Sequence, residues 1–403
     1  MFRNVLILVL AIVLALQYND NNNFYKRYLN KSISIKKELD LEHPDIDRAK
    51  LATNLYIRPE LLGKRDRQQI GIENATILML TRNWELPGVL DAMRSLEDRF
   101  NRDYKYPWTF LNDEPFTDDF IEKTSLMASG KTEYGLIPEE EWSKPKWIND
   151  TRMQESMDKM VEDDVIYAGS LSYRNMCRFN SGFFYKQELV KKYDYYFRVE
   201  PNVEYMCDFQ YDPFTLMRKN GKLYGFIITI HEYEATIPTL WDTIEKFMDK
   251  YPEYIHENNA FEFITNKDII GNIGLNVNSH SRYNLCHFWS NFEIGSLEFF
   301  RSKLYNDFFD FLEETGNFYY ERWGDAPVHT LAVSLLMDKN KIHYFDDIGY
   351  YHEPFLSCPT SNMLKTNNRC ICKKNTKTID LTPHSCLSRW WKFGSGRNFL
   401  KEF

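Results

Sequence analysis

The chain lacks the short motifs that mark several common enzyme classes. It contains no Gly-x-Gly-x-x-Gly, no P-loop and no Gly-x-Ser-x-Gly sequence. These absences count against NAD-dependent enzymes, ATPases and α/β-hydrolases. A basic excess is also missing, since the formal net charge is -8. Proteins that bind nucleic acid normally present a basic face to the phosphate backbone, so we expect no nucleic-acid partner.

Long apolar runs are scarce as well. The one candidate extends from Val5 to Leu16 after a basic residue, Arg3. It is shorter than the roughly 20 residues of a full membrane span, and no clean small-residue cleavage site follows it. The basic flank and the thinner membranes of the early secretory pathway favour an uncleaved anchor over a cleaved signal peptide, which is the alternative. We predict a cytoplasmic tail (1–4), a signal-anchor (5–18), a stem (19–70) and a luminal domain (71–403).

Cysteine is limited to seven residues, and four of them gather near the C-terminus: Cys358, Cys370, Cys372 and Cys386. A zinc ribbon would prefer a two-residue gap between paired cysteines, which this cluster lacks. We therefore expect disulfides, which persist in an oxidising lumen. The odd count leaves at least one free thiol, for which Cys177 or Cys207 is the candidate.

Hydrophobic patterning predicts an α/β fold from about Asn74 onwards. A short apolar strand at Thr76–Thr81, a helix at Trp84–Phe100 and a second strand at Tyr106–Leu111 open the domain. This order is typical of a mostly parallel, nucleotide-binding sheet. Further helices are expected at Thr117–Ser129, Pro238–Met248, Ser296–Leu312 and Asp325–Met337, and further strands at Leu223–Ile230 and Lys341–Phe345.

Several collinear motifs carry a resemblance to a known family. They are Asn74–Asn83, Tyr106–Phe116, Tyr173–Phe184, Arg198–Pro201, Tyr283–Ile294, Arg322–Pro327 and Gly349–Phe355. Over roughly Asn74 to Cys386 the chain resembles the fungal Golgi α-1,2-mannosyltransferases of the KTR/MNT type.

The resemblance implies a GT-A-like fold with a mixed, mostly parallel central sheet flanked by helices. It also implies a luminal catalytic domain held in the Golgi membrane by the N-terminal anchor. The implied reaction moves mannose from GDP-mannose to the 2-hydroxyl of a mannose on N- or O-linked glycans of glycoproteins, with retention of configuration. The implied partners are therefore GDP-mannose, mannose-terminated glycans and the membrane.

Two residues are predicted to bind a metal ion. His352 follows a strand at the edge where α/β sheets bind ligands, and the resemblance assigns its counterpart a divalent cation. A nitrogen ligand favours Mn²⁺ over Mg²⁺. Glu200 opens a Glu-Pro-Asn turn where the family usually has Glu-Pro-Asp. Compared with the family's aspartate, Asn202 keeps an oxygen ligand but lacks the negative charge, which Asp208 or Asp212 could supply. The alternatives are an ordinary half-buried histidine and a solvated turn.

Two residues are predicted to act in catalysis. The resemblance places the family's proposed nucleophile at Glu293, and a carboxylate beside the anomeric carbon would stabilise an oxocarbenium-like transition state. The alternative is a carboxylate at the start of the following helix. Tyr173 could hydrogen-bond a phosphate or the acceptor hydroxyl, unless its run is a strand that packs in the core.

Three residues are predicted to bind the donor. Arg178 could hold the diphosphate with two hydrogen bonds. Arg82, at the end of the first predicted strand, could meet the guanosine. Asp325, in a Trp-Gly-Asp loop, could position the substrate or could cap the helix that follows.

Two other function classes stay open. A retaining glycosidase of the secretory pathway would use two carboxylates such as Glu293 and Glu200, without metal or nucleotide. A non-catalytic glycan-binding protein would keep the fold without the chemistry. Dependence on a metal and binding of GDP distinguish these classes from a transferase.

Overall fold

The computed structural model describes residues 73–265, 282–372 and 377–395. The predicted tail, anchor and stem lie outside these residues. Among the helices that the structure describes, none has the length and apolar character that a membrane crossing needs.

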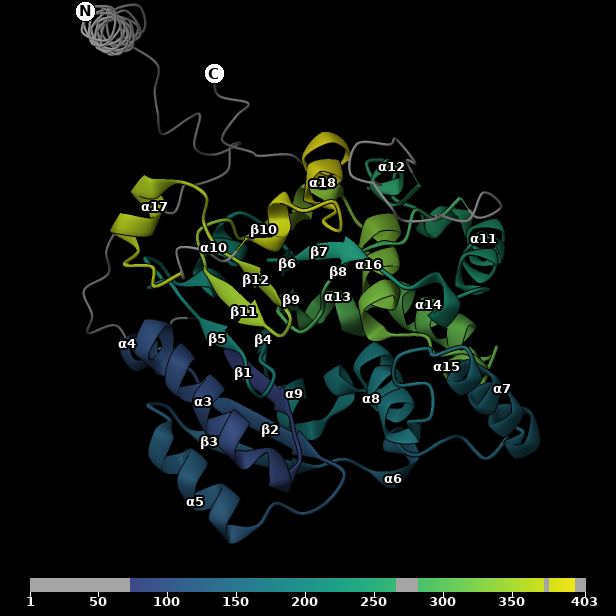
Figure 1. Cartoon of the computed structure of the whole chain (residues 1–403), viewed down its shortest axis with the longest axis horizontal. Coiled ribbons are helices and arrows are strands. Elements are labelled where there is room, and N and C mark those ends of the chain that lie inside the picture. Colours follow the sequence, from purple (N-terminus) through teal and green to yellow (C-terminus); the bar gives the residue numbers. More distant parts are fainter. Residues whose placement is uncertain (1–72, 266–281, 373–376, 396–403) are drawn as a thin grey trace, which may run out of the picture. The chain divides into compact units, whose positions relative to one another are not determined.

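A seven-stranded sheet forms the centre of the described domain (Figure 1), in the order β10-β6-β9-β4-β1-β2-β3. Its strands are β1 (Ala75–Leu80), β2 (Trp108–Asn112), β3 (Thr132–Leu136), β4 (Tyr195–Arg198), β6 (Tyr224–Phe226), β9 (Glu293–Ser296) and β10 (Ile342–Tyr344). All pairings are parallel except those of β9 with β4 and β6. The predicted mixed, mostly parallel sheet is confirmed.

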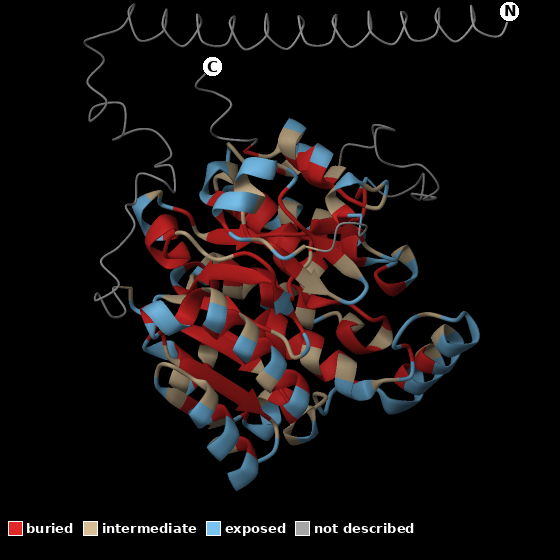
Figure 2. Ribbon diagram, turned by 60° about the vertical axis from the view of Figure 1, so that its left-hand side comes forward, coloured by how far each residue is buried: buried red, intermediate tan, exposed pale blue. Residues whose placement is uncertain are grey.

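Helices flank this sheet and bury its strands (Figure 2). Near β2 and β3, α3 (Leu86–Leu96) packs against α5 (Asp118–Met127). In a second group, α8 (Leu171–Gly182), α14 (Lys303–Glu313) and α16 (Asp325–Leu336) pack against one another. The remaining α-helices of the described residues are α4 (Arg102–Tyr104), α6 (Glu139–Trp142), α7 (Asp150–Glu162), α9 (Glu188–Lys191), α10 (Pro213–Lys219), α11 (Leu240–Lys250), α12 (Phe261–Thr265), α13 (Leu297–Arg301), α15 (Asn317–Tyr320), α17 (Asn362–Asn367) and α18 (Leu387–Phe393).

The reversed direction of β9 places its first residue at the edge where the parallel strands end. Glu293 pairs with Arg198, the last residue of β4, and with Phe226, the last residue of β6. Ligands of open α/β sheets bind outside the carboxyl ends of the strands. Glu293 therefore reaches the ligand-binding edge as the start of a strand, and not as the start of a helix.

Two small sheets extend this edge. One has the order β12-β11-β5, with β5 at Glu204–Tyr205, β11 at Tyr350–His352 and β12 at Phe355–Ser357; the other pairs β7 (Thr229–His231) with β8 (Cys286–Phe288). The predicted strand at 341–345 forms β10 of the central sheet, and His352 ends β11 of the first small sheet. The predicted strand at 223–230 is divided between β6 and β7, which lie in different sheets.

Two serine caps explain where helices differ from the prediction. The Ser170 hydroxyl accepts a hydrogen bond from the Tyr173 amide at 3.1 Å and begins α8, so the Tyr173 run is a helix and not a strand. The Ser302 hydroxyl accepts from the Tyr305 amide at 3.3 Å and begins α14, which divides the helix predicted at 296–312. Serine is favoured at this position because its oxygen satisfies an amide that the helix leaves unpaired.

Disulfide bonds cross-link the C-terminal part of the domain, as predicted. Cys207 bonds Cys370, Cys286 bonds Cys386 and Cys358 bonds Cys372. Of the two candidates for a free thiol, Cys177 is free and buried, whereas Cys207 is not free.

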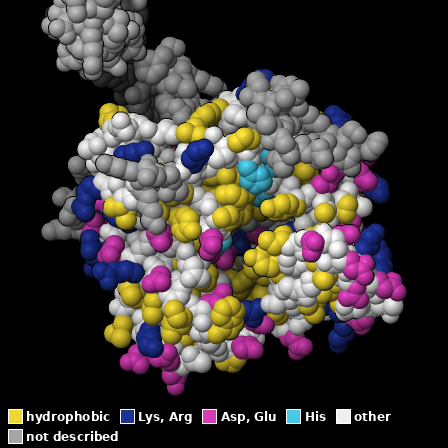
Figure 3. Space-filling model, viewed as in Figure 1, with side chains coloured by type: hydrophobic (Ala, Val, Ile, Leu, Met, Phe, Trp, Pro, Cys, Tyr) yellow, Lys and Arg dark blue, Asp and Glu magenta, His cyan; other side chains and the backbone are white. Residues whose placement is uncertain are grey.

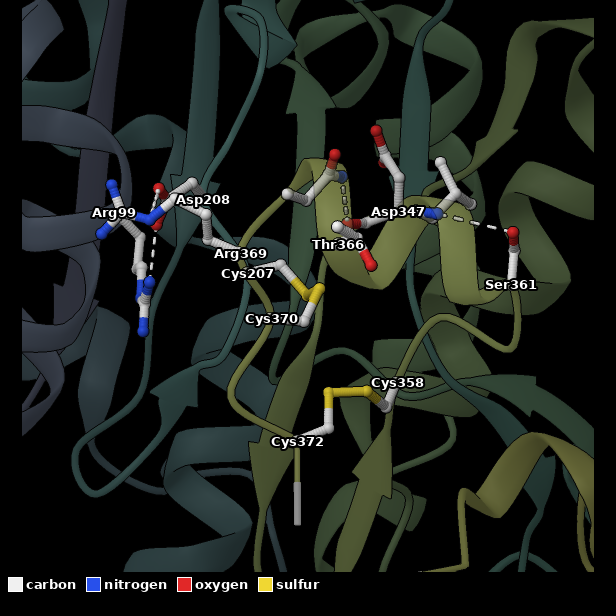
Figure 4. The surroundings of a disulfide bond; sticks show 12 residues. Arg99, Cys207, Asp208, Asp347, Cys358, Ser361, Thr366, Arg369, Cys370 and Cys372 are labelled. Carbon is white, nitrogen blue, oxygen red and sulfur yellow. Dashed lines mark hydrogen bonds and ion pairs between the residues drawn. A yellow bond between two sulfur atoms is a disulfide. The ribbon is translucent and has the colours of Figure 1, made fainter. Parts of the chain in front are cut away.

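The two aspartates suggested as substitutes for the missing charge near Glu200 have other partners. Asp208 lies beside the Cys207–Cys370 bond (Figure 4) and pairs with Arg99 at 2.6 Å and Arg369 at 3.3 Å. Asp212 is buried, caps α10 and accepts a hydrogen bond from the Tyr106 hydroxyl at 2.7 Å. Both carboxylates serve the fold.

Removal of the disulfides should destabilise the protein in proportion to the loops they close. The Cys286–Cys386 bond spans 100 residues and the Cys358–Cys372 bond spans 14. Replacing both cysteines by alanine should lower the free energy of unfolding by about 4.7 kcal/mol for the longer loop and about 3 kcal/mol for the shorter one. Urea unfolding of the two double variants measures the difference, and an equal or reversed order would contradict it.

Candidate functional site

Arg198 is the centre of a buried cluster of charges at the ligand-binding edge. Its Nε donates to Glu200 at 2.7 Å and its Nη1 donates to Asp325 at 2.5 Å, while an oxygen of Glu293 lies 3.9 Å from Nη1. The Ser290 hydroxyl donates to the same Asp325 oxygen at 2.7 Å. Three carboxylates from the turn after β4, from β9 and from α16 thus meet at one guanidinium, which leaves the cluster with an excess of negative charge.

The cluster stabilises its own charges. Burial alone would lower the pKa of Arg198, but Asp325, Glu200 and Glu293 raise it well above its usual value. Burial alone would raise the pKa of Asp325, but Arg198, His329 and the hydrogen bonds from Arg198 and Ser290 lower it below 3.8. A buried ion pair is favourable only when hydrogen bonds satisfy its partners, and this one meets that condition.

Glu293 is enclosed by protein groups. Its side chain is 0% exposed. One carboxylate oxygen accepts a hydrogen bond from the Tyr196 hydroxyl at 2.9 Å, and the other lies 2.9 Å from the Tyr224 hydroxyl and 3.0 Å from Nδ1 of His329. Burial, followed by the Glu293 charge, raises the pKa of both tyrosines well above 10, so both hydroxyls are protonated donors. Direct contact between Glu293 and a sugar stays a prediction.

One ring nitrogen of His352 faces the backbone. Its Nδ1 lies 3.0 Å from the carbonyl oxygen of Glu353, which can only accept, so Nδ1 carries a hydrogen. Binding of a cation by Nε2 stays a prediction. The ring meets Trp289 edge-on, with 4.9 Å between the ring centroids. A backbone acceptor behind a histidine ring is the usual way to fix the orientation of a metal ligand.

Glu200, the second predicted metal ligand, lies near the strand that carries His352. The turn after Glu200 leads into β5, which pairs with β11 through Glu204 and Tyr351, one residue before His352. Burial, followed by the charges of Tyr205 and Glu200, raises the pKa of Tyr350 in the same strand. The fold therefore brings the two predicted ligands to one region, and a nitrogen together with a carboxylate oxygen fits Mn²⁺.

Asn202 has a structural role in the turn that contains Glu200. Its φ angle is 63°, a left-handed conformation that asparagine tolerates better than most residues. Its amide donates to the Gly88 carbonyl at 2.9 Å, and a Cβ on Gly88 would lie only 2.4 Å from the Asn202 side-chain oxygen. The absence of a side chain on Gly88 thus allows the close approach of this turn to α3.

Tyr173 lies in the first turn of α8, directly after Ser172, which Arg82 contacts. Nη2 of Arg82 donates to the hydroxyl of Ser172 at 2.9 Å, and Nη1 pairs with Asp113, which follows β2. The half-buried ring of Tyr173 lies 5.0 Å from the guanidinium carbon of Arg322, and burial raises its pKa well above 10. Tyr173 is therefore a neutral hydroxyl that can donate to an oxygen of a ligand.

Arg178 is tied into the fold. Its Nε donates to Glu313 at 2.7 Å, and its Nη1 donates to the backbone carbonyls of Glu141 at 3.2 Å and Ser143 at 3.3 Å. These partners join α8 to α14 and to the end of α6. Its predicted contact with a diphosphate would compete with these bonds and stays a prediction.

A large cavity lies apart from these residues. It measures about 1190 Å³ and is lined by residues of α3 and β5 and by residues on both sides of the Cys207–Cys370 bond, among them the Arg99–Asp208 pair. None of the seven predicted site residues lines it. The face drawn in Figure 3 shows a hollow near its middle, bordered by histidine, acidic and hydrophobic side chains.

The sequence interpretation missed the groups that hold the predicted residues in place. These groups are Tyr196, Arg198, Tyr224, Ser290 and His329. Two signals were present in the sequence: Arg198 opens the run that contains Glu200, and His329 follows Asp325 by four residues, which places both on one face of a helix.

Asp325→Asn should change how the free energy of unfolding depends on pH, because it removes one charge of the cluster. Because the pKa of Asp325 is lowered in the folded state, its contribution is complete above about pH 4 and is lost as the pH falls through the folded pKa. The variant should be less stable than the wild type at pH 7 by about 1.5–3 kcal/mol, and the difference should shrink below pH 4.

Urea unfolding between pH 7 and pH 3 tests this expectation. Asp119→Asn is the control, since Asp119 forms an exposed pair with Lys123 that should matter little at any pH. A stability difference for Asp325→Asn that is constant over this range would contradict the assignment.

Comparison with known proteins places these residues in a family. The family described as glycolipid 2-alpha-mannosyltransferase matches residues 26–395. Two proteins of Saccharomyces cerevisiae are similar to the chain: probable mannosyltransferase YUR1 is 59% identical over 82% of this chain and 78% of its own length, and probable mannosyltransferase KTR2 is 52% identical over 96% and 91%.

A solved structure is also similar. The Mn/GDP form of core-mannan synthase A (CmsA/Ktr4) from Aspergillus fumigatus matches with a TM-score of 0.74 and 38% identity, over 80% of this chain and 86% of that one. This similarity and the mixed sheet confirm the predicted GT-A-like fold. The chain belongs to the glycolipid 2-α-mannosyltransferase family.

Proposed function

We propose that the protein transfers mannose from GDP-mannose to the 2-hydroxyl of a mannose on N- or O-linked glycans, with retention and with Mn²⁺ as the cation. Membership of the family supports the reaction, and the Mn/GDP form of a solved relative supports the donor and the metal. The observation that carries the proposal is the Nε2 of His352, which its backbone partner leaves available for a metal near the turn that begins with Glu200.

Each residue at this edge of the sheet would have a separate role in the reaction. His352 and Glu200 would hold the cation, which neutralises the departing diphosphate when bound. Arg198 fixes the orientation of Glu200 and Asp325. The protonated hydroxyl of Tyr173 would donate to a phosphate or acceptor oxygen, and Arg82 would meet the guanosine side of the donor. Glu293 would contribute negative charge opposite the developing oxocarbenium ion.

A retaining glycosidase is a poorer fit to this geometry. It would need one carboxylic acid free to donate a proton and one carboxylate free to attack. Glu293 has all its hydrogen-bond partners within the protein, and Glu200 is paired with Arg198. Neither carboxyl group is arranged for those two tasks.

The proposed location is the Golgi lumen. Three disulfides support an oxidising compartment. We propose that the apolar run at 5–18 anchors the chain as a single-pass type II protein, with residues 19–70 as the stem and the catalytic domain in the lumen.

A transfer assay tests the function directly. A secreted form that starts at about Asn30, given GDP-mannose, α-methyl mannoside and Mn²⁺, should form an α-1,2-linked dimannoside, and EDTA should abolish the product. Product formed equally well in EDTA would contradict the role of the metal. Failure both to bind GDP-mannose and to form product would favour the non-catalytic alternative.

His352→Ala should abolish metal-dependent turnover. We expect kcat/KM to fall more than about 100-fold, because losing even an outer partner of a metal ligand typically costs 10–100-fold. Isothermal titration with Mn²⁺ should show weakened binding while the thermal midpoint of unfolding stays close to that of the wild type. His256→Ala is the control, since His256 is also half-buried but lies in the loop after α11. Unchanged Mn²⁺ affinity in His352→Ala would refute the ligand assignment.

A further inference from the structure

We propose that His329 is a positioning residue for sugar transfer: it shares a single proton with Glu293 and thereby fixes the orientation and charge of that carboxyl group. The inference concerns a residue that is not predicted to contact the donor, the acceptor or the metal ion. It rests on the proposed function, because positioning has meaning only for a reaction that occurs at this edge.

The hydrogen-bond partners of His329 determine where its protons lie. Its Nε2 is 2.9 Å from the backbone carbonyl oxygen of Asn180, which can only accept, so Nε2 carries a hydrogen. Its Nδ1 is 3.0 Å from a carboxylate oxygen of Glu293. A bare Nδ1 cannot face an ionised carboxylate at this distance without a proton between them. The pair therefore holds one proton there, either as imidazolium and carboxylate or as neutral imidazole and carboxylic acid.

The pair is buried among protein groups, and its further hydrogen bonds join Glu293 to the hydroxyls of Tyr196 and Tyr224 and His329 to the Asn180 carbonyl. Both side chains are 0% exposed. Phe184 and Phe300 pack on the imidazole, with ring centroids 6.1 Å and 5.0 Å away, and exclude water from this side. The other groups that face the pair are charged or polar: Tyr196, Tyr224, Tyr305, Arg198 and Asp325. Because burial keeps these tyrosines protonated, none of them is an anionic competitor for the proton between His329 and Glu293.

The position of His329 in α16 connects the His329–Glu293 pair to the charge cluster around Arg198. Asp325 opens this helix and binds Arg198, and His329 lies four residues later on the same face and binds Glu293. One helix therefore orients two of the carboxylates that meet Arg198. A shift of Glu293 would disturb Arg198, and through it Glu200, so His329 controls the charge distribution at the edge without touching substrate.

Two substitutions separate the two bonds of His329. The amide nitrogen of asparagine falls near the place of Nδ1 and that of glutamine near the place of Nε2. His329→Asn should keep a donor toward Glu293, and His329→Gln should keep only the bond to Asn180. We expect kcat to fall about 10-fold in His329→Asn and about 100-fold in His329→Gln, with KM for GDP-mannose within about threefold of wild type.

A double-mutant cycle tests whether His329 acts through Glu293. In a Glu293→Gln background, either substitution of His329 should lower kcat by less than about threefold more, because residues that act as one unit are not additive. His343→Gln is the matched control: it alters another buried histidine, on β10, and should leave kcat unchanged. Equal losses in His329→Asn and His329→Gln, or additive losses with Glu293→Gln, would overturn the proposal.

Histidine ¹⁵N NMR of the wild-type protein provides a readout that needs neither turnover nor a variant that folds poorly. The His329 signals should show a hydrogen on Nε2 and a proton shared at Nδ1, and a bare Nδ1 that accepts no hydrogen bond would refute the pair. If the wild type makes no mannoside, the proposed function fails and the positioning role fails with it, while the NMR result alone decides whether the shared proton exists.

Discussion

The rest of the site depends on the ion pairs that the Arg198 guanidinium forms. Its two bonds to Asp325 and Glu200 join the start of α16 to the turn after β4, and its charge faces Glu293 at the start of β9. Buried carboxylates without a cation would repel one another and lose their hydration, at a cost of several kcal/mol per ion. The positions of these three elements are therefore coupled, and any cation held by Glu200 is coupled to Asp325 as well.

The antiparallel strand β9 makes this cluster possible. In a wholly parallel sheet, only strand ends reach the ligand-binding edge. Because β9 runs in the opposite direction between β4 and β6, it brings the beginning of a strand to that edge, directly beside the ends of two others. Glu293 is thereby held by main-chain pairing on both sides, and its carboxylate meets Tyr196 of β4 and Tyr224 of β6.

The sequence predicted the fold class and most elements because their apolar periodicity is local. It failed where a single side chain decided a boundary, as Ser170 and Ser302 do at the starts of α8 and α14. The site residues were predicted from residue types that suit metal and sugar chemistry, and their roles stay predictions. The groups around Glu293 could not be found in this way, because tyrosines in short strands and a histidine in an apolar helix look like ordinary core residues.

The closed environment of Glu293 bears on how this carboxylate would act. To reach a sugar carbon, it would have to leave Tyr196, Tyr224 and His329, and a hydrogen bond to a charged group is worth about 1.5–3 kcal/mol. Stabilisation of a nearby positive charge requires no such movement, because the field of a fixed carboxylate acts across a water-poor interior. The same three bonds that hinder attack also keep the charge in place before the reaction begins. The geometry therefore favours a preorganised electrostatic role for Glu293, with the shared proton of His329 setting how much negative charge it presents.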